Sequence, residues 1–148
     1  MSSQFNIDNN GIGGTPFLTF TVDTTADKDF TQEDFDNNLT ACVMSNNNEV
    51  GMGSAGDKLF GRVVWLSQEL KDGTRVPALC AVQARGVARF KYEPTHPPII
   101  NQMVEVAGNG RVCATVFEFV KSECGGHLFR GQVMAVDEVA QTCDVWLG

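Results

Sequence analysis

Long apolar runs are absent from this sequence of 148 residues. No run approaches the roughly 18 to 20 apolar residues that a helix needs to cross a membrane. The first fourteen residues, MSSQFNIDNNGIGG, also lack the basic and apolar regions of a secretion signal. We therefore expect no membrane partner, and a protein that stays in the cytosol where it is made. The length suits one domain, or one domain that carries an arm.

Basic residues are scarce relative to acidic ones. Lys and Arg number 11 against 18 Asp and Glu, which gives a net charge of -7. This balance disfavours sequence-independent binding to nucleic acid, because the phosphates are also negative. We expect no direct nucleic-acid partner. As an alternative, five bases on separate predicted strands could form a patch on one face of a barrel. They are Arg62, Arg85, Arg89, Lys91 and Arg111.

Paired cysteines and histidines are also few. The five cysteines are odd in number and widely spaced, which favours reduced, buried thiols over a disulfide framework. Cys124-Gly-Gly-His127 could join Cys113 and Cys143 in a zinc site, but structural zinc sites usually use two tight pairs. His96 is the other histidine, and no nucleophile has a base placed beside it. We predict no catalytic residue, no metal and no cofactor, and a protein that is not an enzyme.

A glycine motif at residues 51–56, GMGSAG, has the spacing of the dinucleotide-binding fingerprint. That fingerprint needs a strand before it and a helix N-terminus after it to receive the pyrophosphate. Here a strand pattern, KLFGRVVWL, follows the glycines. We therefore predict a glycine-rich turn at this place.

Helical periodicity is hard to find, and apolar residues alternate with a period near two almost throughout. After residue 38, short strand patterns are separated by turn signals at intervals of roughly 8 to 12 residues, which predicts an all-β barrel or sandwich. An earlier strand is predicted at 15–23. The other predicted strands cover residues 39–44, 58–67, 78–83, 87–92, 103–106, 111–119, 128–136 and 143–147.

Two dipeptides predict tight hairpins between these strands. Asp72-Gly73 and Asn109-Gly110 each lie between two strand patterns. Both dipeptides suit type I′ turns, whose central residues need a positive φ. Residues 46–48 and 137–142 predict two longer turns.

The region before residue 38 has a different composition. Residues 1–14 are rich in Asn, Ser and Gly, so we assign residues 1–37 to an extended arm and acidic segment, and residues 38–148 to the β-barrel domain. A short helix or turn is an option near residues 31–38. The arm is either a disordered tail or a segment whose large apolar residues dock on a partner. A docked arm would add its strand, TPFLTFTV, to an exposed sheet edge of that partner. The predicted interface residues are Phe5, Ile7, Phe17, Leu18, Phe20, Phe30 and Phe35.

The order of the strand patterns after residue 38 resembles that of the head decoration, or capsid cement, proteins of tailed bacteriophages. The likeness lies in phrases that are typical of the fold, and none of them is a catalytic signature. The phrases are AGDKLFGRVV (55–64), AVQARGVA (81–88), VEVAGNGRV (104–112), RGQVMAVDE (130–138) and DVWL (144–147).

The resemblance implies a small β-barrel or β-tulip-like domain with an extended N-terminal arm and little helix. It also implies a non-enzymatic virion protein that is assembled in the host cytoplasm and binds the outside of the icosahedral head, often as a homotrimer. There it would bridge neighbouring copies of the major capsid protein and stabilise the shell against internal DNA pressure. Two alternatives stay open: a small β-barrel module that binds a carbohydrate or a host protein, and an enzyme or metal-dependent domain.

Overall fold

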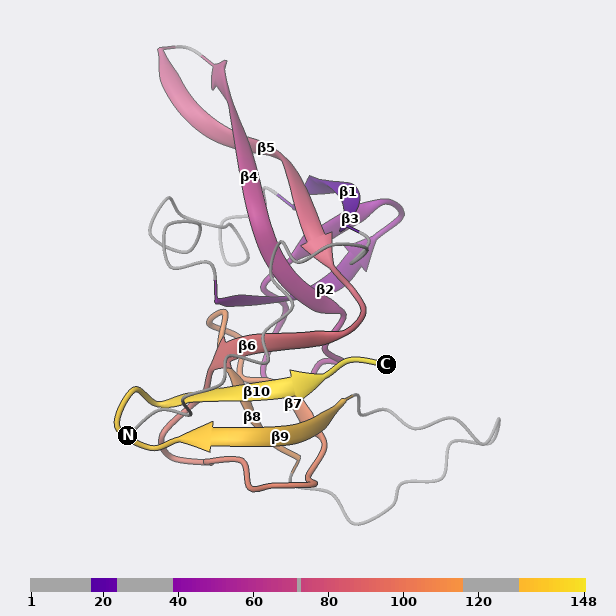
Figure 1. Cartoon of the computed structure of the whole chain (residues 1–148). Coiled ribbons are helices and arrows are strands. Elements are labelled where there is room, and N and C mark those ends of the chain that lie inside the picture. The colour runs from indigo at the N-terminus through magenta and orange to yellow at the C-terminus, as the bar shows by residue number, and fades with distance from the viewer. Residues whose placement is uncertain (1–16, 24–38, 72, 116–130) are drawn as a thin grey trace.

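The computed structural model describes residues 17–23, 39–71, 73–115 and 131–148 (Figure 1). Within these ranges every regular element is a strand, which confirms the predicted all-β fold with a barrel. The segment near residues 31–38, where a short helix was an option, lies outside the described residues. No helix in the described ranges is long and apolar enough to span a membrane.

Five strands close into a barrel of mixed direction. β1 is parallel to β3, and the other pairs are antiparallel. The barrel closes because β1 pairs with β5 as well as with β3. In the order in which they neighbour one another, the strands are β1 (Phe17–Val22), β3 (Glu49–Gly51), β2 (Thr40–Asn46), β4 (Gly61–Lys71) and β5 (Thr74–Gln83).

Two smaller sheets lie beside the barrel, below it in Figure 1. The first has the order β6, β10, β9 and is antiparallel, and the second is the hairpin of β7 and β8. A single parallel bridge between Tyr92 and Val112 joins the end of β6 to β8. The bounds are β6 (Val87–Lys91), β7 (Val104–Val106), β8 (Val112–Ala114), β9 (Gln132–Asp137) and β10 (Thr142–Trp146).

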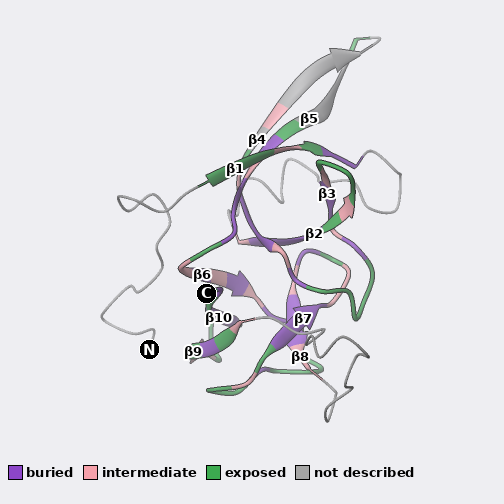
Figure 2. Cartoon of the chain, turned by 90° about the vertical axis from the view of Figure 1, so that its right-hand side faces the viewer, coloured by how far each residue is buried: buried purple, intermediate pink, exposed green. Residues whose placement is uncertain are grey.

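The apolar core has two clusters, and β2 belongs to both. Successive residues of a strand point to opposite faces. Cys42 therefore packs inside the barrel with Val63 and Val82, whereas Ala41 and Val43 pack with the cluster around Phe90 and Val145 of the smaller sheets. Figure 2 shows buried residues along β7 and exposed residues along most of β1. Because β2 is covered on both faces, it holds the barrel and the small sheets together.

Most predicted strands match observed ones, with ends shifted by a few residues. The strand predicted at residues 87–92 shows the expected period of two, because Phe90 and Tyr92 are buried while Arg89 and Lys91 are half-buried. The sequence analysis missed β3, which is three residues long and ends in the glycine motif. That motif forms a turn, as expected, in which Gly53 and Gly56 have φ values of 71° and 91°.

β1 has a different place from the one expected. The boundary at residue 37 placed this strand in the arm, and we expected it to pair with a partner's sheet. Instead, Phe17 to Thr21 pair with β5 of the same chain, and Thr21 and Val22 pair with β3. The physical reason is that the barrel would have two open edges without β1, and its backbone groups satisfy both of them.

The hairpin expectations have mixed outcomes. Lys71 pairs with Thr74 across the predicted turn at residues 72–73, and Gly73 has a φ of 77°. The predicted type I′ turn at Asn109-Gly110 is wrong. The positive φ values there belong to Gly108 and Gly110, and Ala107 N donates to Arg111 O at 2.9 Å, so the loop is longer than two residues.

Candidate functional site

The loop between β3 and β4, residues 52–60, borders two hollows of different chemistry. The loop is held in place by β7, because Gly56 N donates to Val106 O at 3.0 Å and Val106 N donates to Asp57 O at 3.2 Å. The Asp57 carboxylate accepts a hydrogen bond from Ser54 N at 2.8 Å, which closes the turn. The walls of both hollows are therefore tied to strands.

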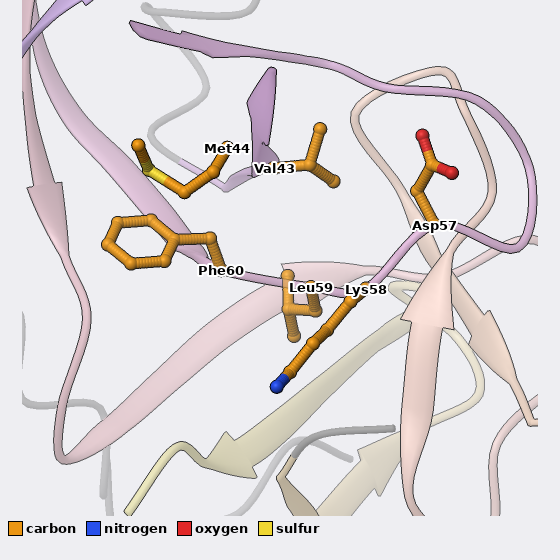
Figure 3. A pocket seen from close by; sticks show the side chains of 6 residues that line it. All are labelled: Val43, Met44, Asp57, Lys58, Leu59 and Phe60. Carbon is orange, nitrogen blue, oxygen red and sulfur yellow. The ribbon is translucent and has the colours of Figure 1, made fainter. Parts of the chain in front are cut away.

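The first hollow has a volume of about 600 Å³ and is largely apolar. Val43 and Met44 of β2 face Leu59 and Phe60 across it (Figure 3). Val43 and Leu59 are core residues, whereas Met44 is 42% exposed. Asp57 and Lys58 complete the lining, and the Lys58 side chain extends away from Asp57. We call this the apolar hollow, and it suits an apolar side chain or a ligand with an apolar group.

The second hollow has a volume of about 400 Å³ and carries ionisable groups. Glu93 and His96 line it from the segment after β6, Glu105 from β7 and Cys113 from β8. Gly56 and two alanines provide the rest of its lining. We call this the acidic hollow.

Burial shifts the pKa values of two groups in the acidic hollow, Glu105 and Cys113. It raises the pKa of Glu105, against smaller opposing effects of the Cys113 thiol and His96. Burial, together with the charge of Glu105, raises the pKa of Cys113 to about 11. Cys113 is therefore a thiol at neutral pH and is a poor nucleophile.

A third feature lies on the outside of the barrel, where β1, β5 and β4 are neighbours. Cross-strand pairs place Trp65 opposite Ala81, and Leu79 opposite Thr21. Phe17 shares this side with Thr21, because residues separated by an even number share a face of a strand. We call Phe17, Trp65 and Leu79 the apolar outer face; their exposed fractions are 42%, 48% and 42%.

The β4–β5 hairpin projects from the barrel next to this face (Figure 1). β2 pairs with β4 at residues 61–63 and β1 pairs with β5 at residues 79–83. Beyond those points the two strands pair only with each other, within the part of the chain that the structure describes. The backbone N–H and C=O groups on such edges can accept an added strand.

The predicted interface residues differ in their exposure. Phe17 lies on the apolar outer face, and Leu18 is also exposed, at 46%. Phe20 is half-buried instead, because it packs on the barrel core and makes an edge-to-face contact with Phe60 at 5.4 Å between ring centroids. The other four residues, Phe5, Ile7, Phe30 and Phe35, lie outside the described residues.

The five bases of the alternative nucleic-acid patch are not gathered on one exposed face. Arg62 is fully buried and donates to Gln83 Oε1 at 2.6 Å. Arg89 makes a two-pronged ion pair with the buried carboxylate of Asp144, at 2.7 and 3.0 Å. Arg111 lies 3.8 Å from a Glu93 oxygen. The remaining bases are Arg85, which is exposed, and Lys91, which is half-buried.

The cysteines that the structure describes are buried, and no disulfide joins them to one another. Burial raises the pKa of Cys80 and of Cys143 to about 12 in each case, so both are thiols. Cys124 and His127 of the alternative zinc site lie outside the described residues. Among the residues that are described, no group of three His, Cys, Asp or Glu side chains is placed to hold a metal ion.

No protein family, curated protein or solved structure matches this chain.

Sequence reasoning missed Trp65, Leu79 and the acidic hollow. Strict alternation places Trp65 on the same face as the core residue Val63. A register shift between these residues turns Trp65 outward, opposite Ala81. No sequence signal marks that shift. Glu105 and Cys113 were each visible in predicted strands, and their cross-strand pairing follows from the β7–β8 hairpin.

Proposed function

We propose that this chain is a non-enzymatic structural protein of a virion, which decorates the outer surface of a phage head. The observation that supports this proposal is the apolar outer face, where Trp65 and Leu79 are both exposed and lie diagonally across paired strands, opposite Ala81 and Ser67. Tryptophan is enriched among the residues that dominate binding energy in protein interfaces. The proposed partner is the major capsid protein, and the proposed location is the capsid exterior after assembly in the host cytoplasm.

The geometry also supports binding in many copies. A face carried by strands needs little ordering on binding, so less of the contact energy is lost to conformational entropy. The open edges of the β4–β5 hairpin offer a second contact beside the apolar outer face. Two modest contacts in each copy, repeated over a shell, add up to strong attachment. We further propose that the protein acts as a homotrimer that bridges neighbouring capsid subunits and stabilises the shell against internal DNA pressure.

The test is sedimentation of a lysate from the infected native source through a density gradient. We expect the chain to travel in many copies with DNA-filled particles. The double variant W65S/L79S should stay folded and attach at least about tenfold more weakly, since each side chain is worth more than about 1 kcal/mol at an interface centre. Val139→Ser, at a residue that is 87% exposed on the β9–β10 turn, is the matched control.

Two results would overturn the proposal. In one, the wild-type chain stays at the top of the gradient as a free small protein. In the other, W65S/L79S attaches as well as the control variant. The apolar hollow favours a second candidate in that case, a β-barrel module that binds a soluble ligand or a host protein. Saturable binding of a soluble ligand by the monomeric chain would support this candidate.

A further inference from the structure

Glu105 is the most unusual ionisable group in the described part of the chain. Glu105 is 9% exposed and lies at the middle of β7, opposite Cys113 of β8. The contact that the carboxylate receives is weak, a thiol at 3.9 Å from Oε1. A buried carboxylate destabilises a fold unless a cation or strong hydrogen-bond donors compensate it. Among the described residues, the Cys113 thiol is the hydrogen-bond donor that the structure gives this carboxylate.

The second carboxylate of the hollow is already compensated. Glu93 Oε2 accepts a hydrogen bond from Asn109 Nδ2 at 3.2 Å and lies 3.8 Å from Arg111 Nη1. The ion pairs formed between described residues are this one and Arg89–Asp144, and neither involves Glu105. Counting only partners among the described residues, Glu93 of the acidic hollow has a cationic neighbour and Glu105 has none.

His96 has a backbone that is fixed next to Glu105. His96 N donates to Glu93 O at 3.0 Å, and Ala114 N, beside Cys113, donates to His96 O at 3.0 Å. The imidazole Nδ1 lies 3.1 Å from Thr95 Oγ1. His96 therefore adds a hydrogen-bonding group to the lining of the hollow.

The remaining lining leaves room for an apolar stem. Ala55, Gly56 and Ala107 are small, and a Cβ atom built on Gly56 meets no other atom within 4 Å. Lysine and arginine side chains combine such a stem with a cationic head. The volume of about 400 Å³ accepts both parts.

We propose that the acidic hollow binds a primary ammonium or guanidinium group, with Glu105 as its ionic partner and the small residues around Gly56 against its stem. A metal ion does not fit, because the described residues offer no group of three suitable ligands. The site is separate from the apolar outer face, so this inference does not rest on the proposed virion function. The cation belongs either to a basic side chain of a protein partner or to a free polyamine.

The test uses the full-length chain and small probes of defined chemistry. Backbone amide signals are followed by NMR during titration with n-butylammonium chloride, n-butylguanidinium chloride and uncharged n-butanol at pH 7. We expect saturable shifts at Gly56 and Glu105 with the two cations only. Glu105→Gln should weaken binding by about tenfold or more, because a neutral amide replaces the carboxylate and the ion pair with the bound cation is lost. Glu138→Gln, at an exposed glutamate on the β9–β10 turn, should bind like the wild type.

Several outcomes overturn the proposal. They are no saturable shift with either cation, equal binding of n-butanol, and equal affinity of the Glu105→Gln and Glu138→Gln variants. The comparison of cation with alcohol uses the wild-type chain alone, so it decides the matter even where a variant does not fold. Titration with a blocked Gly-Lys-Gly peptide and with spermidine then separates the two sources. Tighter binding of the peptide assigns the site to a protein partner, and tighter binding of spermidine assigns it to a polyamine.

Discussion

The two hollows beside the β3–β4 loop share one wall and differ in chemistry. Residues 57–60 line the apolar hollow and residues 55–56 contribute to the acidic one, so the loop is common to both. The difference comes from the strands opposite. β2 presents Val43 and Met44 to the first hollow, whereas β7 and β8 present Glu105 and Cys113 to the second. The chemistry of each hollow is therefore set by the sheet that the loop faces.

The hollows also differ in their relation to stability. Two residues that line the apolar hollow, Leu59 and Val43, also belong to the core, so their burial contributes directly to the stability of the fold. The acidic hollow keeps a carboxylate whose ionisation opposes folding. Binding sites commonly contain groups that lower the stability of the fold. Three substitutions test this difference in how the two hollows affect stability.

Leu59→Ala should give the largest effect. Leu59 is fully buried in the core cluster around Phe90 and Val145, and it lines the apolar hollow. We expect a loss of about 3 kcal/mol in the free energy of unfolding, from the lost transfer energy and the enlarged cavity, measured by urea denaturation. Met44→Ala, at an exposed residue of the same hollow, is the control and should cost less than about 1 kcal/mol. Equal losses in the two variants would contradict the distinction between core and rim.

Gly108→Ala should lower the free energy of unfolding by about 2 kcal/mol, because it disturbs the wall of the acidic hollow. Gly108 has a φ of 94°, and a Cβ atom there would lie 2.9 Å from Ala55 N of the β3–β4 loop. Gly73→Ala is the matched control, because Gly73 has a φ of 77° and no atom within 4 Å of its Cβ position. The control shares the backbone strain but lacks the contact. Urea denaturation should therefore show the larger loss for Gly108→Ala, and n-butylammonium binding should weaken in that variant only.

Glu105→Gln should give the smallest effect, and its sign depends on pH. The pKa of Glu105 is raised above its ordinary value of 4.5, so the folded state holds its proton to higher pH than the unfolded state does. This contribution to stability is fully present below pH 4.5 and is lost as pH rises through the folded pKa. The variant has no such loss, so we expect it to be more stable than the wild type at neutral pH and similar to it at low pH. Thermal unfolding across the pH range measures the difference, and a difference that does not grow with pH would be contrary to expectation.

The fold was largely readable from the sequence, because periodicity and turn residues act locally. Alternation predicted nine of the strands in approximate position, including β1, and Asp72-Gly73 marked the long hairpin. The candidate site was much less readable. Of the predicted interface residues, Phe17 reached an exposed apolar face with Trp65 and Leu79, while Phe20 became a core contact. Which face a residue takes depends on register, and register depends on pairing between distant segments.

Residue type and neighbours along the chain account for most of the strands and for their apolar or polar character, although not for the short strand β3. That β1 closes the chain's own barrel depends on the folded chain, since β1 pairs with β5 over a separation of about 60 residues. Only the register shift after Val63 turned Trp65 outward. The meeting of Glu105 with Glu93, His96 and Gly56 in one hollow was likewise decided by packing, because their strands and loops touch only in the folded chain.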